Sequence, residues 1–135
     1  MNISLNWLTD YVEVAIPATE LEQLFTRIGL NHEGTTETAT DLVLDLEVTS
    51  NRPDCLGHIG VARELAVATG KEFTPPVIPD IATSGHADQL TSVDVQAPDL
   101  CSRYSARVIR GVKIGPSPEW LVERLEAIGM RSVNN

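Results

Sequence analysis

The 135-residue sequence predicts an α+β fold made of two modules and a linker. Three observations predict this fold: helical spacing of apolar residues before residue 30, alternation of apolar and polar residues over residues 41–49, and a proline-rich stretch after residue 73. Residues 1–72 are expected to form a winged-helix-like module with the order helix–helix–hairpin–helix. Residues 73–90 are expected to be a Pro/Ser/Gly linker, and residues 91–135 to begin a second α+β module.

Two helices are expected at the start of the chain. Ser4 is expected to cap a short first helix, because a serine side chain can accept a hydrogen bond from a backbone N–H of the first turn. Pro17 is expected to open the second helix, and Gly29 stands where a left-handed C-terminal cap is needed. The apolar stripe of the second helix follows the spacing i, i+3, i+4, i+7 and consists of Leu21, Leu24, Phe25 and Ile28.

A hairpin is expected next. Residues 30–38 predict a first strand, followed by a polar turn, and residues 41–49 predict a second strand by their period of two. The apolar set of the second strand is Leu42, Leu44, Leu46 and Val48, and the polar set is Asp45, Glu47 and Thr49. We therefore expect one buried and one solvated face, as in an antiparallel sheet packed on helices.

The polar segment Asn51-Arg52-Pro53-Asp54 separates the hairpin from a third helix over residues 56–69 that ends at Gly70. Its buried face is expected to consist of Ile59, Ala62, Leu65 and Ala66. The segment has two interpretations. In the structural one, which we favour, Asp54 caps the helix and Arg52 pairs with a nearby acid. In the functional one, Arg52 contacts a phosphate or an acidic partner, and Asn51 reads a hydrogen-bonding edge.

The second module is expected to begin with strands at residues 92–96 and 103–114 and to continue into a helix after Ser117-Pro118-Glu119. A capping hydroxyl, a proline in the first turn and an acid near the positive end of the helix dipole make a strong helix start. The apolar stripe of this helix is Leu121, Leu125 and Ile128, and Gly129 is expected to end it.

The formal charge of −9 is unevenly spread. Residues 1–99 hold 16 acidic and 4 basic residues, a net −12, whereas residues 100–135 hold 3 acidic and 6 basic residues, a net +3. Binding to nucleic acids depends on neutralising phosphates, so possible RNA contacts are confined to Arg103, Arg107, Arg110 and Lys113. The alternative is that these side chains line the solvent face of a strand or balance the acidic half.

No catalytic, cofactor-binding or metal-binding residue is predicted. The sequence has no nucleophile elbow, phosphate loop, zinc-protease helix or paired-glycine fingerprint. Cys55 and Cys101 are expected to be reduced thiols, because they form no C-x-x-C pair and no histidine stands near either at zinc spacing. With no apolar run long enough to span a bilayer and no signal-peptide pattern, a cytoplasmic protein without membrane contact is expected.

Several segments resemble one family in collinear order. The segments are Ile3-Ser4-Leu5-Asn6-Trp7-Leu8, Leu44–Thr49, Asn51–Gly57, Gly60–Leu65, Arg103–Val108, Pro116–Leu121 and Gly129–Asn135. They are similar to the N-terminal part of bacterial phenylalanine–tRNA ligase (phenylalanyl-tRNA synthetase) β subunits. The match spans nearly the whole chain, except that only about a dozen residues separate Gly29 from Leu42. Many bacterial members insert an OB-fold tRNA-binding module at this point.

The resemblance implies an accessory fragment of an α2β2 aminoacyl-tRNA synthetase. The parent enzyme charges tRNA-Phe with phenylalanine, using ATP and magnesium, and its catalytic centre lies in the α subunit. Residues 91–135 would then open an editing-type module, whose pocket residues lie downstream of Asn135. The expected partners are the α subunit, the remaining β-subunit modules and, through the full enzyme, tRNA-Phe. The fragment itself is expected to be structural and inactive.

Two other functions are considered. The chain could be a stand-alone protein-interaction module of winged-helix-like architecture. It could also be a winged-helix DNA binder, but the net −12 of residues 1–99 argues against that function.

Overall fold

The computed structural model describes residues 1–134 and divides into two compact units. The first unit comprises Met1–Val77 together with the residues from Pro116 onwards, and the second comprises Ile78–Gly115. All strands and all helices of more than one turn belong to the first unit among the described residues.

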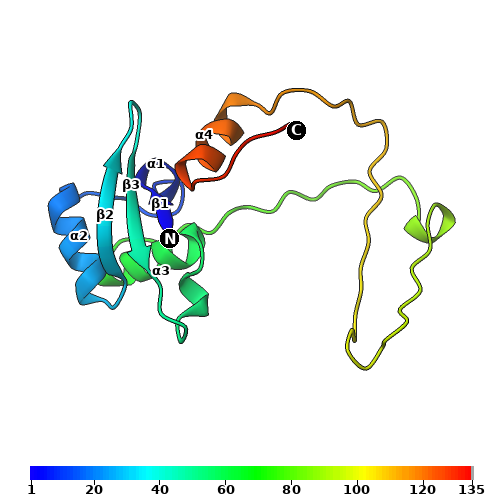
Figure 1. Ribbon diagram of the computed structural model, residues 1–135, viewed down its shortest axis with the longest axis horizontal. Coiled ribbons are helices and arrows are strands. Elements are labelled where there is room, and N and C mark those ends of the chain that lie inside the picture. The colour runs from blue at the N-terminus through cyan, green and yellow to red at the C-terminus, as the bar shows by residue number, and fades with distance from the viewer. Residues whose placement is uncertain (135) are drawn as a thin grey trace. The chain divides into compact units, whose positions relative to one another are not determined.

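An antiparallel three-stranded sheet organises the first unit (Figure 1). Its strands are β1 (Asn2–Ser4), β2 (Asn31–Glu37) and β3 (Leu42–Glu47), and β3 lies in the centre, in the order β1-β3-β2. Ile3 pairs with Leu44 on one side of β3, and Thr35 pairs with Leu44 on the other. The predicted hairpin is therefore confirmed, and β1 is an additional strand. Three residues are too few to show an alternating pattern, so the sequence did not predict β1.

Three helices build the rest of this unit: α1 (Leu5–Leu8), α2 (Ala18–Arg27) and α3 (His58–Thr69). The hydrophobic core forms where these helices meet one face of the sheet. The fully buried side chains of the core include Ile3, Leu8, Leu21, Phe25, Leu44, Leu46, Val61 and Leu65. The α+β class is confirmed. The predicted order of helix, helix, hairpin and helix is found with β1 added in front, and the winged-helix-like description stays a prediction.

The helix ends show which capping predictions were correct. The Ser4 side chain accepts a hydrogen bond from the Trp7 backbone N–H at 3.0 Å, as expected for an N-cap. Gly70 ends α3 in the left-handed conformation, with a φ of 68°. Asp54 does not cap α3, because the helix begins after Gly57 and the carboxylate of Asp54 binds Arg52 instead.

One of the four residues predicted to form the buried face of the third helix is exposed. Ile59 was expected to be buried but is exposed, whereas Ala62, Leu65 and Ala66 are buried as predicted. The helix begins two residues later than expected because Pro53–Cys55 forms a separate 3-10 turn. Gly60 then lies against this turn, where an added Cβ would be only 1.8 Å from the backbone oxygen of Asp54. Only a residue without a side chain fits this close approach of the helix to the turn.

The helix α4 (Glu119–Ala127) packs beside β1. It covers part of the sheet face that was expected to be solvated, and Val43 on that face is buried. The predicted cap at Ser117 is wrong: Pro118 is the N-cap residue, and the buried Ser117 hydroxyl oxygen has no hydrogen-bond partner.

The second unit, Ile78–Gly115, runs mostly extended, with a single 3-10 turn at Ala87–Gln89 (η2). The strands predicted at residues 92–96 and 103–114 are not formed in this described segment. Alternation marks a segment that can join a sheet, but ladder hydrogen bonds require a neighbouring strand. Because neither segment has such a neighbour, both predictions were wrong at the level of secondary structure.

The sheet register generates a stability prediction. Leu46 is fully buried, whereas its neighbour Glu47 is exposed. We expect Leu46→Ala to lower the free energy of unfolding by about 2–4 kcal/mol, because it removes buried methyl groups and leaves a cavity. Glu47→Ala is the matched control on the opposite face, and we expect it to cost about 0.5 kcal/mol or less. Chemical denaturation measures both, and equal midpoints for the two variants would contradict the register.

Candidate functional site

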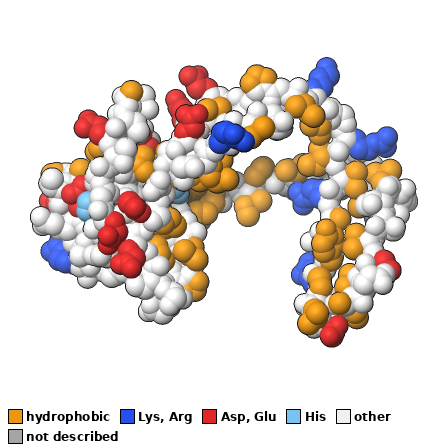
Figure 2. Space-filling model, viewed as in Figure 1, with side chains coloured by type: hydrophobic (Ala, Val, Ile, Leu, Met, Phe, Trp, Pro, Cys, Tyr) orange, Lys and Arg blue, Asp and Glu red, His pale blue; other side chains and the backbone are white. Residues whose placement is uncertain are grey.

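The predicted RNA-contact residues lie together in the second unit. Arg103, Arg107, Arg110 and Lys113 are exposed along one extended stretch, and no acidic residue stands between positions 100 and 118. Lys and Arg side chains project from this unit in Figure 2. The structure therefore presents an uninterrupted basic segment, which we define as residues 103–113.

The Asn51–Asp54 segment forms an ion-pair network around Arg52. The guanidinium of Arg52 binds Asp54 through two hydrogen bonds, of 3.1 Å from Nε and 2.9 Å from Nη2, and its Nη2 also lies 3.1 Å from Glu64. The Arg52 guanidinium lowers the pKa of Asp54 to about 2. Both carboxylates in turn raise the pKa of Arg52. The favoured structural pairing of Arg52 is confirmed, because two acids of its own chain already bind the group that would contact a phosphate.

Cys55 lies beneath this network and is fully buried. Burial, followed by a hydrogen bond to Asp54, raises the pKa of the Cys55 thiol to about 11. The thiol is therefore protonated at neutral pH and is a poor nucleophile. Asp54, Cys55 and Glu64 offer possible metal-ligand atoms within 4.8 Å of one another. However, Arg52 already donates to Asp54 and lies beside Glu64, so its charge opposes that of a cation at this position.

A second cluster joins three elements around Trp7. The His58 ring, from the first turn of α3, stacks on the Trp7 ring with 4.1 Å between the centroids. Arg124 of α4 places its guanidinium carbon 5.1 Å from the Trp7 centroid and 5.6 Å from that of Trp120. The same guanidinium pairs with Asp10 at 2.5 Å. Cation–π contacts and an ion pair thus hold α4 against α1.

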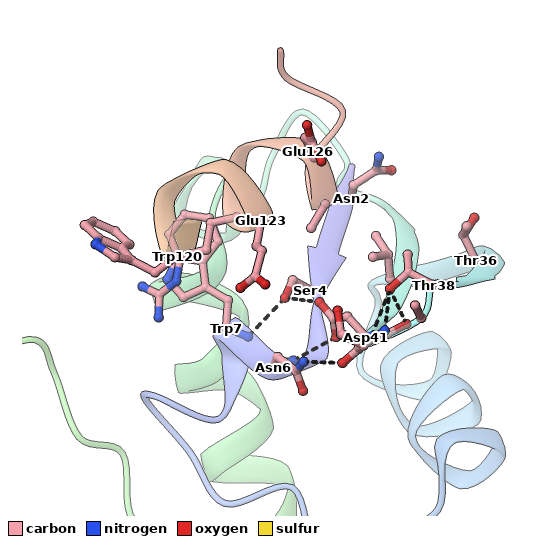
Figure 3. A pocket seen from close by; sticks show the side chains of 15 residues that line it. Asn2, Ser4, Asn6, Trp7, Thr36, Thr38, Asp41, Trp120, Glu123 and Glu126 are labelled. Atoms are coloured by element: carbon pink, nitrogen blue, oxygen red, sulfur yellow. Dashed lines mark hydrogen bonds between the residues drawn. The ribbon is translucent and has the colours of Figure 1, made fainter. Parts of the chain in front are cut away.

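A cleft of about 520 Å³ opens between α4, β1 and the turn of the β2–β3 hairpin (Figure 3). Asp41 in that turn holds the hairpin to the start of α1. Its carboxylate accepts a hydrogen bond of 2.5 Å from the Ser4 hydroxyl and one of 3.0 Å from the Asn6 backbone N–H. The acids Glu123 and Glu126 line the α4 side of the cleft, so its lining has an excess of negative charge.

Ser4, His58 and Asp41 lie close together without the geometry of a nucleophilic triad. In such a triad the histidine accepts the serine hydroxyl proton, and the aspartate orients the histidine. Here Nε2 of His58 accepts the Ser4 backbone N–H at 3.0 Å, and the Ser4 hydroxyl donates to Asp41. Ser4 is also buried. The arrangement therefore joins β1, α1, α3 and the hairpin turn instead of activating a nucleophile.

Sequence reasoning did not predict the roles of Asp41, His58 and Arg124. The bonds from Asp41 to Ser4, from His58 to Ser4 and from Arg124 to Asp10 span 37, 54 and 114 positions of sequence, so no local spacing pattern relates these partners. The only local signal was the polar turn that contains Asp41, since Asp in a turn tends to accept nearby hydrogen bonds.

The buried His58 generates a pH prediction. Burial, and then the nearby Arg124 charge, lower the pKa of His58 to about 4, while Asp41 partly opposes the change. Because the unfolded histidine has a pKa near 6.5, the unfolded state binds more protons between about pH 6.5 and pH 4. The contribution of neutral His58 is therefore present above pH 6.5 and is lost as the pH falls towards 4.

We expect the free energy of unfolding to decrease across that window by an amount on the order of 3 kcal/mol at most. His58→Gln should flatten the decrease, whereas His86→Gln, in the second unit, is the control and should leave it unchanged. Urea denaturation at several pH values measures the effect. A slope that is the same in the wild type and in His58→Gln would contradict the assignment.

Comparisons with known proteins are consistent with this organisation. Residues 100–135 match the B3/4 domain family. The chain is 49% identical over all 135 residues to the phenylalanine–tRNA ligase β subunit of Rhodopirellula baltica, of which it covers 20%. It is 47% identical over 95 residues to the protein of the same name from Anaeromyxobacter dehalogenans, and 50% identical over 95 residues to that from Geobacter sulfurreducens. Each of these two matches covers 70% of this chain and 12% of the relative.

The chain thus spans a fifth or less of the length of these curated relatives. No helix among residues 1–134 is both long enough and apolar enough to cross a membrane. The matches confirm the resemblance found in the sequence motifs: the chain matches an N-terminal fragment of the phenylalanine–tRNA ligase β subunit.

Proposed function

We propose that this chain is an accessory, structural part of a phenylalanine–tRNA ligase β subunit and has no active site of its own. The whole-chain identity of 49% to a β subunit carries the proposal. In the complete enzyme, which we take to be a cytoplasmic α2β2 assembly, the α subunit would use ATP and magnesium to charge tRNA-Phe with phenylalanine. The chain would contribute a winged-helix-like first module and the opening of an editing-type module.

The geometry of the first unit supports a structural role. Several of its polar side chains bind partners within the chain: Asp41 binds Ser4 and Asn6, and Arg52 binds Asp54 and Glu64. An active site needs a nucleophile or a base that is free to react and lies within reach of the substrate. The second unit supports a different role, because its basic segment carries Arg103, Arg107, Arg110 and Lys113 on exposed backbone. We propose this segment as the part of the chain that contacts tRNA.

Catalytic silence of the isolated chain is the first test. We expect no phenylalanine-dependent pyrophosphate exchange and no deacylation of tRNA-Phe that carries tyrosine. Adding the complete enzyme to the same reaction is the positive control. Turnover that co-purifies with the 135-residue chain after rigorous removal of the host synthetase would overturn the proposal.

Binding of tRNA is the second test. We expect labelled tRNA to bind weakly, with a dissociation constant of about 10⁻⁴–10⁻⁶ M, because the chain is acidic overall. The affinity should fall steeply as the salt concentration rises, because the contacts are to phosphates. Arg103→Ala/Arg107→Ala should weaken binding and reduce the salt slope by about two.

The matched control removes two arginines from the acidic first unit, Arg27→Ala/Arg63→Ala, and should leave the salt slope unchanged. Tight, salt-insensitive binding, or equal loss in both double variants, would show that the basic segment is not the contact surface.

A further inference from the structure

The second unit is an insertion in the first. Its residues, Ile78–Gly115, follow Val77 and precede Pro116, and both of these flanking residues belong to the first unit. The basic segment of residues 103–113 therefore lies on a stretch of chain whose two ends both join the first unit. The way in which each end is held decides how freely the basic segment moves.

The end that enters the insertion is held by backbone contacts. Thr74 donates its backbone N–H to the Tyr11 carbonyl at 2.8 Å, and Phe73 forms an antiparallel bridge with Val12. Phe73 also packs against the hydrophobic core. This end is far from the basic segment, because Thr74 and Arg103 are 29 positions apart. A tether of that length restricts the cations only weakly.

The end that leaves the insertion is held much closer to the basic segment, by α4. This helix begins six positions after Lys113. None of its 9 residues, all of which the structure describes, is buried, so apolar burial contributes little to holding it. Arg124 makes the charged contact instead: its guanidinium pairs with Asp10 at 2.5 Å. The same guanidinium carbon lies 5.1 Å from the centroid of the Trp7 ring.

The two attachments meet at neighbouring residues. Arg124 binds Asp10 and Thr74 binds Tyr11, so both ends of the stretch 75–118, which we call the tethered loop, attach to the turn after α1. If the contact of Arg124 opened, the basic segment would lie on a chain held firmly at one end only. Such a chain samples more conformations, and it loses them when it binds a partner.

We propose that Arg124 is a positioning residue for the basic segment: by closing the tethered loop, it reduces the conformational entropy that residues 103–113 lose when they bind RNA. Arg124 acts through the loop and not by contact with RNA, because its guanidinium already binds Asp10. This inference rests on the proposed function, since it gives α4 a part in the binding of tRNA. The acidic first unit stays attached through Thr74 whether the loop is closed or open.

Asp10→Ala tests the inference, because loop closure and simple charge predict opposite results. Removing an acid from an acidic chain should tighten the binding of tRNA if only net charge matters. If Arg124 positions the basic segment, the loss of its partner should instead weaken binding by about three- to ten-fold. Glu13→Ala is the matched control: it removes an acid that pairs with Lys71 at 2.9 Å outside the tethered loop, and it should not weaken binding.

A cross-link separates closure from charge. Asp10→Cys/Arg124→Cys, combined with Cys101→Ser, keeps the net charge of the chain but lacks the ion pair, and Cys55 is buried and stays unlabelled. One sample is joined by a short bismaleimide, and the other is capped at both thiols with N-ethylmaleimide. We expect the joined sample to bind tRNA as tightly as the wild type. The capped sample should bind about three- to ten-fold more weakly, with the same salt slope, because the same cations contact phosphates.

Glu13→Cys/Lys71→Cys, again with Cys101→Ser, is the control for the cross-link, because this pair precedes the tethered loop. Its joined and capped forms should bind tRNA equally. Tighter binding by Asp10→Ala, or equal binding by the joined and capped forms of Asp10→Cys/Arg124→Cys, would overturn the positioning role of Arg124.

The proposed function has a separate outcome in the same experiments. If Arg103→Ala/Arg107→Ala weakens the binding of tRNA while opening the loop has no effect, the positioning role fails and the proposed contact segment stands. If no form of the chain binds tRNA, or if binding is indifferent to Arg103→Ala/Arg107→Ala, the proposed contact segment fails, and the positioning role fails with it.

Discussion

The pairing of β1 with β3 is the contact on which the first unit depends. It fastens the first residues of the chain to the central strand: the Leu46 backbone N–H donates to the Met1 carbonyl at 2.9 Å, and the N-terminal ammonium pairs with Asp45 at 2.6 Å. Ser4 ends this strand and also caps α1, so the position of β1 decides where Trp7 lies. His58 and Arg124 both contact Trp7, which connects α3 and α4 to the same point.

This arrangement separates the electrostatic roles of the chain. In the first unit, most cations lie against acids: Arg52 against Asp54 and Glu64, Lys71 against Glu13, and Arg124 against Asp10. Such exposed pairs stabilise little individually, but they leave an acidic surface that repels phosphate. In the second unit, no acidic residue stands between positions 100 and 118, the stretch that contains the basic segment. The two units therefore differ in charge: the first pairs most of its cations with acids, and the second carries four cations within residues 103–113.

Much of the first unit followed from local patterns. Helical spacing identified α2, alternation identified β3, and the glycine after Thr69 identified the end of α3, because each signal arises from neighbours within a few residues. The contacts around Trp7 did not follow, since they join residues that only the fold brings together. Alternating apolar and polar residues over residues 103–114 wrongly predicted a strand. Such alternation shows that a segment can join a sheet, but it does not show that a partner strand is present. Ile59 was misplaced because its helix has apolar residues on both sides, and periodicity alone cannot choose between them.

Amide hydrogen exchange tests the central role of β1 most directly. If β1 holds the first unit together, the Leu46 N–H bound to Met1 and the Ser4 N–H bound to His58 exchange only when the whole unit unfolds. Their opening free energies should then equal those of the slowest amides of α2 and α3. Rapid exchange at Leu46 and Ser4, with α2 and α3 still protected, would show that β1 detaches alone and that the unit does not depend on it.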